Sequence, residues 1–160
     1  DHEFVHMNDI PARSPQTSLG MVAGHLDTHF SALFPFGFGL SYTDFSYQNI
    51  QLSKEVLGFD DTLTVTVEVQ NIGNLAGEDV AQLYVRDLVA NVTRPVKELK
   101  GFQRIALKAK ERKTISFSLT KSDLAFYDRK MQFGAETGQF QLWLGNSSDA
   151  TLSRFFTLSK

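Results

Sequence analysis

The chain begins with a pattern that could bind a metal. The residues "HEFVH", His2 to His6, match H-E-x-x-H, in which two histidines one helical turn apart bind zinc and the glutamate acts as general base. "HLDTH", His25 to His29, repeats the histidine spacing. The first match begins at the second residue, and Pro11 limits any helix there to about two turns. We therefore interpret both histidine pairs as surface groups and expect no bound metal.

Paired carboxylates are the next candidates, because a glycosidase needs a general acid and a nucleophile or base about 5 to 10 Å apart. The pairs Asp60–Asp61 and Glu78–Asp79 are adjacent in sequence. Neighbours in strands or hairpin loops point apart, and their role as turn residues explains them. All four histidines precede Phe30, so no Ser-His-Asp triad is suggested. We expect no catalytic residue and no cofactor in this chain.

The run "FPFGFGLSY", Phe34 to Tyr42, places Gly37 and Gly39 in a G-x-G pattern. A dinucleotide-binding loop would need a third glycine and a following helix, but "SYTDFSYQN" is rich in strand and turn formers. Rings that alternate with glycines are typical of a wedge between surfaces, because the glycines permit close backbone approach and the rings bury apolar area. The alternative is that the rings belong to the core of the domain. The residues predicted to form the inter-domain docking segment are Pro35, Phe36, Gly37, Phe38, Gly39, Leu40 and Tyr42.

Composition is that of a globular domain with an extension. The chain has 160 residues, of which 42% are hydrophobic and 21% charged, and it contains no cysteine. The net charge of -2 and the pI near 6.1 provide no basic field for nucleic acid or an anionic membrane surface. No apolar run approaches the roughly 20 residues of a membrane helix. We therefore expect neither nucleic acid nor membrane as a partner.

Short strands fill the chain from about Leu63 onward. In "LTVTVEVQN", apolar residues alternate with Thr, Glu and Gln, as in a half-buried strand. Further strands are indicated in "DFSYQNIQLS", with a bulge near Asn49, and in "VAQLYVRD", "LKGFQRIAL", "TISFSLT", "FQLWLG" and "FFTLS". "KSDLAFYD" indicates a short helical turn capped by Ser122. The pattern predicts an all-β, immunoglobulin-like antiparallel sandwich over residues 41–160, preceded by an extended, irregular arm and linker over residues 1–40.

Several segments resemble the C-terminal fibronectin type III-like domain of family 3 glycoside hydrolases, the group of bacterial β-glucosidases and β-xylosidases. "PFGFGLSYTDF" resembles the segment that leads into that domain, and "RPVKELKGF", Arg94 to Phe102, resembles a second signature. "TISFSLTKSDLAFYD" and "GQFQLWLGNSS" resemble its closing strands. The resemblance covers about residues 35–158. The family stretch N-x-G-x-x-x-G-x-x-V-x-Q-x-Y is matched by Asn71, Gly73, Gly77, Val80, Gln82 and Tyr84.

The resemblance implies a non-catalytic accessory role, because the family's catalytic residues lie in a barrel and an α/β domain that precede this one. It implies those two domains as partners, a periplasmic or secreted location, and a parent enzyme that hydrolyses terminal β-glucosyl bonds with retention. We also expect the arm to allow self-association. Two alternatives remain: a carbohydrate-binding module, which would need an exposed platform at Trp143, and an adhesion or assembly domain.

Overall fold

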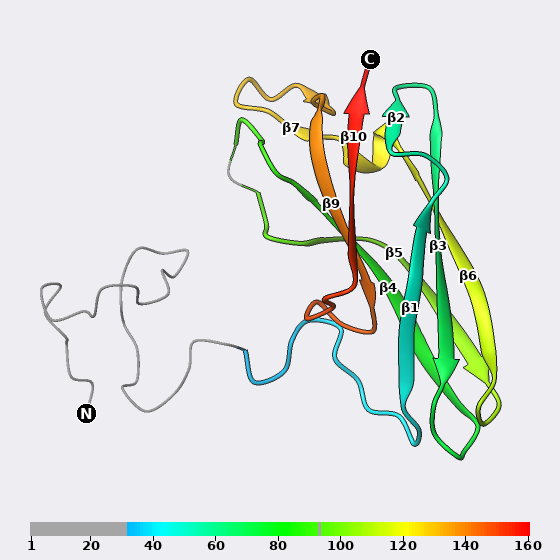
Figure 1. Ribbon diagram of the computed structural model, residues 1–160. Helices are drawn as coiled ribbons and strands as arrows, with labels where there is room; N and C mark the ends of the chain where they lie inside the picture. Colours follow the sequence, from blue (N-terminus) through cyan, green and yellow to red (C-terminus); the bar gives the residue numbers. More distant parts are fainter. Residues whose placement is uncertain (1–31, 93) are drawn as a thin grey trace, which may run out of the picture. The chain divides into compact units, whose positions relative to one another are not determined.

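The computed structural model describes residues 32–92 and 94–160 (Figure 1). Backbone contacts divide the chain into two units, Asp1–Phe34 and Pro35–Lys160. The histidine pairs and most of the predicted arm lie outside the described residues. The expectations for metal binding and for self-association through the arm therefore stay predictions, as does the domain boundary at residue 40.

The second unit is built from short strands and one short 3-10 helix, η2 (Lys121–Leu124). The longer strands are β1 (Phe45–Leu52), β3 (Thr62–Asn71), β4 (Gly77–Asp87), β5 (Glu98–Leu107), β6 (Arg112–Thr120), β9 (Gly138–Gly145) and β10 (Ser153–Ser159). The shorter ones are β2 (Val56–Gly58), β7 (Phe126–Tyr127) and β8 (Phe133–Gly134).

These strands form two main sheets that face each other (Figure 1). One has the order β1-β3-β6, and the other has the order β2-β10-β9-β4-β5, while β7 and β8 form a separate hairpin. The pairings are antiparallel except for β2 with β10, which is parallel. The predicted all-β sandwich is confirmed. The sequence did not indicate β2, because three residues are too few to show a period.

A single core lies between the two sheets. On β3, every second side chain is fully buried, as the alternation predicted. The facing side chains of the five-stranded sheet come from alternate positions of β4, β9 and β10. The core residues of these four strands are Leu63, Val65, Val67, Val69, Ala81, Leu83, Val85, Phe140, Leu142, Leu144, Phe156 and Leu158. Burial of these apolar side chains is the main driving force for the fold.

Of two local features predicted from the sequence, the bulge in β1 is present, whereas the cap of η2 is a different residue. The register of β1 against β3 shifts between Gln48 and Gln51, and Asn49 adopts a left-handed φ of 55°, so the predicted bulge is confirmed. The cap of η2 is Thr120 and not Ser122. The backbone N–H and the hydroxyl of Thr120 both donate to the Asp123 carboxylate at 2.7 Å, which places the cap two residues earlier than predicted.

Candidate functional site

The linker segment, residues 35–43, is attached to the sandwich through its backbone. Its first half forms a turn in which the Phe38 N–H donates to the Pro35 carbonyl at 3.0 Å and Gly37 has a φ of 78°. The side-chain amide of Gln82 on β4 donates to the Gly37 carbonyl at 3.1 Å. The Ser148 N–H donates to the Phe36 carbonyl at 2.8 Å. The turn is therefore held through its backbone carbonyl groups, which residues of any type possess.

Gln82 is held in place by a second residue of β4. The Tyr84 hydroxyl donates to Gln82 Oε1, which leaves Nε2 to donate both to Gly37 and to the Asn146 carbonyl, at 2.8 Å from the latter. Both side chains are almost fully buried. Burial raises the pKa of the Tyr84 phenol, so this hydroxyl remains a donor at neutral pH. The two side chains therefore fix the orientation of the amide that holds the linker segment.

The other end of the linker segment is held by Asn71, at the end of β3. Asn71 Oδ1 accepts from the Thr43 hydroxyl at 2.7 Å and from the Gly73 N–H at 3.0 Å. Its Nδ2 donates to the Leu75 carbonyl at 2.8 Å and to the Leu107 carbonyl at 3.2 Å. The Asn71 side chain is fully buried. One amide therefore joins the linker segment to the β3–β4 turn and to the end of β5.

Three glycines make room for these contacts. A Cβ at Gly37 would lie 2.1 Å from Gln82 Oε1, where a left-handed φ already disfavours a side chain. A Cβ at Gly73 would lie 2.0 Å from Thr43 Oγ1, and one at Gly77 would lie 2.5 Å from Thr43 Cγ2. We call Asn71, Gly73, Gly77, Gln82 and Tyr84 the linker clamp, because each contacts the linker segment or positions a residue that does.

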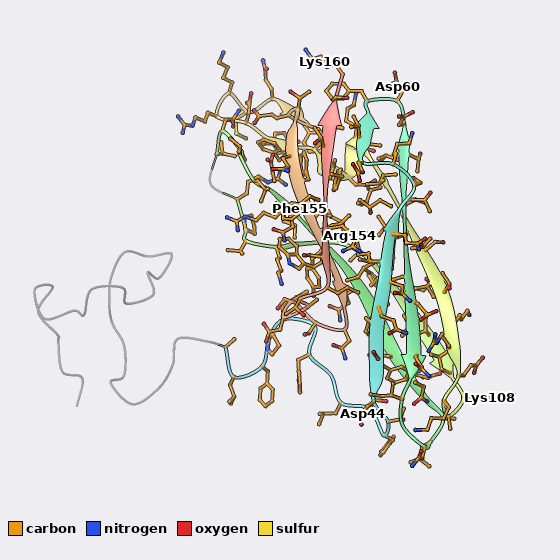
Figure 2. The ribbon with its side chains drawn as sticks, in the orientation of Figure 1. Asp44, Asp60, Lys108, Arg154, Phe155 and Lys160 are labelled. Carbon is orange, nitrogen blue, oxygen red and sulfur yellow. The ribbon has the colours of Figure 1, made fainter. Side chains whose placement is uncertain are left out.

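The large apolar side chains of the linker segment are exposed. The exposed fractions are 67% for Phe36, 47% for Phe38, 91% for Leu40 and 95% for Tyr42. Figure 2 shows the side chains of this blue to cyan stretch standing off the ribbon. The alternative that these rings belong to the core is therefore wrong. The core is filled by the strands themselves, and the linker segment turns its carbonyls, not its rings, toward the sheet.

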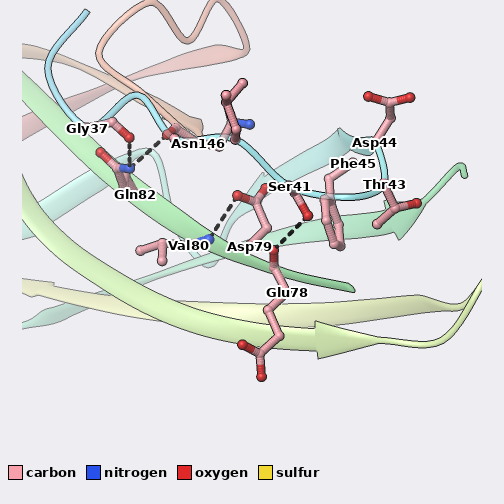
Figure 3. A pocket seen from close by; sticks show the side chains of 12 residues that line it. Gly37, Ser41, Thr43, Asp44, Phe45, Glu78, Asp79, Val80, Gln82 and Asn146 are labelled. Atoms are coloured by element: carbon pink, nitrogen blue, oxygen red, sulfur yellow. Dashed lines mark hydrogen bonds between the residues drawn. The ribbon is translucent and has the colours of Figure 1, made fainter. Parts of the chain in front are cut away.

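A pocket of about 330 Å³ lies between the linker segment and β4 (Figure 3). The two acidic residues of β4 that line it, Glu78 and Asp79, already have hydrogen-bond or ion-pair partners. Asp79 accepts from the Tyr47 hydroxyl at 2.8 Å and from the Val80 N–H at 2.9 Å, and Glu78 pairs with Arg104. Burial, and then the Asp79 carboxylate, raises the pKa of Tyr47, which keeps this donor protonated.

The carboxylate pairs weighed as catalytic groups are structural. Glu78 and Asp79 belong to strand β4 and not to a turn, so their side chains leave opposite sides of the backbone. Asp61 does lie in a turn, where its N–H donates to the Gly58 carbonyl at 3.1 Å. Its carboxylate pairs with Lys54 at 2.8 Å. The Glu78 and Asp79 carboxylates therefore point in opposite directions (Figure 3), and the Asp61 carboxylate already has a partner.

Trp143 on β9 is covered and cannot serve as a sugar platform. Only 9% of it is exposed, and Lys97 Nζ lies 4.8 Å above its ring centroid. The same ammonium donates to the carbonyls of Ser148 at 2.7 Å and Ala150 at 2.8 Å, and burial lowers its pKa. Lys97 therefore anchors the β9–β10 loop that supplies the Ser148 N–H to the linker segment. The alternative of a carbohydrate-binding module required an exposed Trp143, and this requirement is not met.

Among the described residues, no helix is long and apolar enough to span a bilayer. The residues predicted to dock lie together on one segment, and their docking role stays a prediction. The sequence did not identify what holds that segment to the sandwich. In the sequence, Gln82 and Tyr84 have the pattern of the polar face of an ordinary strand. Only their positions in the stretch N-x-G-x-x-x-G-x-x-V-x-Q-x-Y distinguish them. Lys97 and Thr43 gave no signal of their own.

Comparison with known proteins gives consistent results. The sequence model of the family described as "Fibronectin type III-like domain" matches residues 79–148. A periplasmic β-glucosidase of Salmonella typhimurium is 38% identical over 145 residues, which are 91% of this chain and 19% of the relative. A β-xylosidase of Formosa agariphila is 47% identical over 118 residues, 74% of this chain and 16% of the relative.

Solved structures agree with these relatives. A β-glucosidase from Erythrobacter marinus superimposes with a TM-score of 0.81 at 35% identity, covering 90% of this chain and 19% of that one. A β-glucosidase from Listeria innocua in complex with isofagomine gives a TM-score of 0.80 at 33% identity, covering 98% and 22%. The chain therefore spans about a fifth of the length of the proteins it matches.

The two glycines of the G-x-G pattern should respond differently to substitution. Gly37→Ala introduces a side chain at a left-handed φ and against Gln82, whereas a Cβ at Gly39 meets no atom within 4 Å. We expect Gly37→Ala to release the turn at a cost of about 1–3 kcal/mol. Chymotrypsin, which cuts after phenylalanine, should then cleave at Phe36 and Phe38 about tenfold faster or more. Gly39→Ala, which also follows a phenylalanine, is the control, and equal cleavage of both variants would contradict the clamp.

Asn71 should contribute far more to stability than Asn74 in the same turn. Asn71→Ala leaves buried donors and acceptors without partners, because its amide makes four hydrogen bonds. We expect it to lower the free energy of unfolding by more than about 2 kcal/mol. Asn74 is exposed, so Asn74→Ala should change the value by less than about 0.5 kcal/mol. Urea denaturation measures both, and a similar small effect for the two variants would overturn the assignment.

Proposed function

Because this chain carries a fibronectin type III-like domain homologous to the C-terminal part of family 3 β-glucosidases and β-xylosidases, we propose that it is the non-catalytic accessory domain of such an enzyme. Its role is to stabilise and orient the catalytic domains. The linker segment is the contact: its rings pack on the preceding domains while its backbone stays bound to the sandwich.

One observation carries this proposal. Phe36, Phe38, Leu40 and Tyr42 expose large apolar side chains on a segment whose backbone is held by directed hydrogen bonds. A flexible tail with exposed rings would collapse onto any apolar surface. A clamped segment instead presents its rings at fixed positions, which lowers the entropy lost on docking. Exposed aromatic side chains gathered in this way are typical of an interaction surface.

The proposal assigns the chemistry to the remainder of the enzyme. A preceding barrel would carry the nucleophile and an α/β domain the acid/base residue, and the complete protein would hydrolyse terminal β-glycosidic bonds. One relative is named a periplasmic enzyme, which supports a periplasmic or secreted location. Without the other domains, the exposed rings would favour self-association.

The first experiment is to read the coding sequence upstream of Asp1, where a barrel and an α/β domain should be found. In the complete polypeptide, Phe36→Ser combined with Phe38→Ser should then loosen the docking of this domain. Fully burying one phenylalanine contributes about 1.5–3 kcal/mol, so the thermal midpoint of the domain should fall by several degrees. Differential scanning calorimetry measures this change.

Val89→Ser is the matched control. Val89 is 80% exposed in the loop between β4 and β5, so its loss should leave the midpoint unchanged. An upstream sequence without glycosidase domains would contradict the proposal. So would a double variant whose thermal midpoint equals that of Val89→Ser.

A further inference from the structure

The two outer faces of the sandwich differ in the apolar residues that they expose. On the three-stranded sheet, the side chains that alternate with the core residues of β3 and β6 are polar or charged. They include Thr64, Thr66, Glu68, Gln70, Thr114, Ser116 and Ser118. Such a face is well solvated and offers no apolar area for a partner.

The outer face of the five-stranded sheet instead carries apolar residues beside the linker clamp. Phe102 on β5 pairs directly with Gln82, and Leu99 pairs with Tyr84. Residues paired across antiparallel strands share a face, so both side chains lie on the side that holds the linker segment. Phe102 is 72% exposed, whereas Gly101 beside it faces the core, where a Cβ would lie 3.0 Å from Phe117.

Phe102 therefore has no packing role within the sandwich. Phe102 lies on the outer face of β5, within the stretch Arg94 to Phe102, and is paired with Gln82, which binds the linker segment. Val80, 37% exposed, pairs with Arg104 on the same face. An exposed ring in such an apolar group lowers the solubility of a protein unless another surface covers it.

We propose that the outer face of β4 and β5, marked by Phe102, Leu99 and Val80, continues the docking surface of the linker segment and is covered by the preceding domain of the same polypeptide. This inference rests on the proposed function. The chain spans about a fifth of relatives whose C-terminal part it matches, so most of such a protein precedes Asp1. The linker segment precedes the sandwich in the sequence and is bound to this face by the hydrogen bond from Gln82. The domain thus meets its neighbour with one sheet and turns its polar sheet to solvent.

Cysteine labelling of the complete polypeptide tests this directly, because the chain contains no cysteine of its own. Three single variants are made: Phe102→Cys on the proposed face, Phe36→Cys on the linker segment and Ser116→Cys on the polar sheet. Each maleimide reaction rate is measured on the native protein by peptide mass spectrometry and divided by its rate in urea. We expect Phe102→Cys and Phe36→Cys to react at least tenfold more slowly than Ser116→Cys.

The outcomes separate this inference from the function on which it rests. If Phe36→Cys is protected and Phe102→Cys reacts as fast as Ser116→Cys, the docking is confined to the linker segment and the inference is wrong. If neither is protected, the proposed docking function fails as well. A Phe102→Lys variant provides a second measure: it should lower the thermal midpoint of the complete polypeptide, while Ser116→Lys should not, and equal midpoints would overturn the inference.

Discussion

The hydrogen bonds from the buried Gln82 amide are the interaction on which the rest of this account depends. Its Nε2 donates to carbonyls of the linker segment and of the β9–β10 loop, and the Tyr84 hydroxyl fixes its orientation. A buried amide with every partner in place is rigid, because rotating it would leave several polar groups unsatisfied at once. This rigidity gives a loop without regular secondary structure a defined path over the sheet.

The glycines of the linker clamp and of the linker segment follow from that requirement. Gly37 must lack a side chain because Gln82 occupies the space, and Gly73 and Gly77 must lack one because Thr43 does. Lys97 contributes at one remove, since it holds the loop that binds the Phe36 carbonyl. Polar groups thus hold the backbone of the linker segment, and its large apolar side chains stay exposed, as the proposed docking requires.

Much of the fold was predictable from the sequence, because one buried face imposes a period of two. The alternation in β3 and the bulge at Asn49 are examples. The short strand β2 was not predictable, nor was the burial of Gln82 and Tyr84 on the outer face of β4. A two-residue period places such side chains in solvent. The linker segment and the β9–β10 loop, which both contact Gln82, come from distant parts of the sequence. The docking role of the exposed rings stays a prediction.

The central claim is that the linker clamp holds the linker segment rigid before any partner binds. Backbone ¹⁵N relaxation of the chain at low concentration measures this most directly. We predict order parameters near 0.85 for residues 36–43, like those of β4, together with nuclear Overhauser effects between the Gln82 side-chain amide and Gly37. Order parameters below about 0.6 across the same residues, with β4 still rigid, would show that the segment is flexible on its own and would contradict the account.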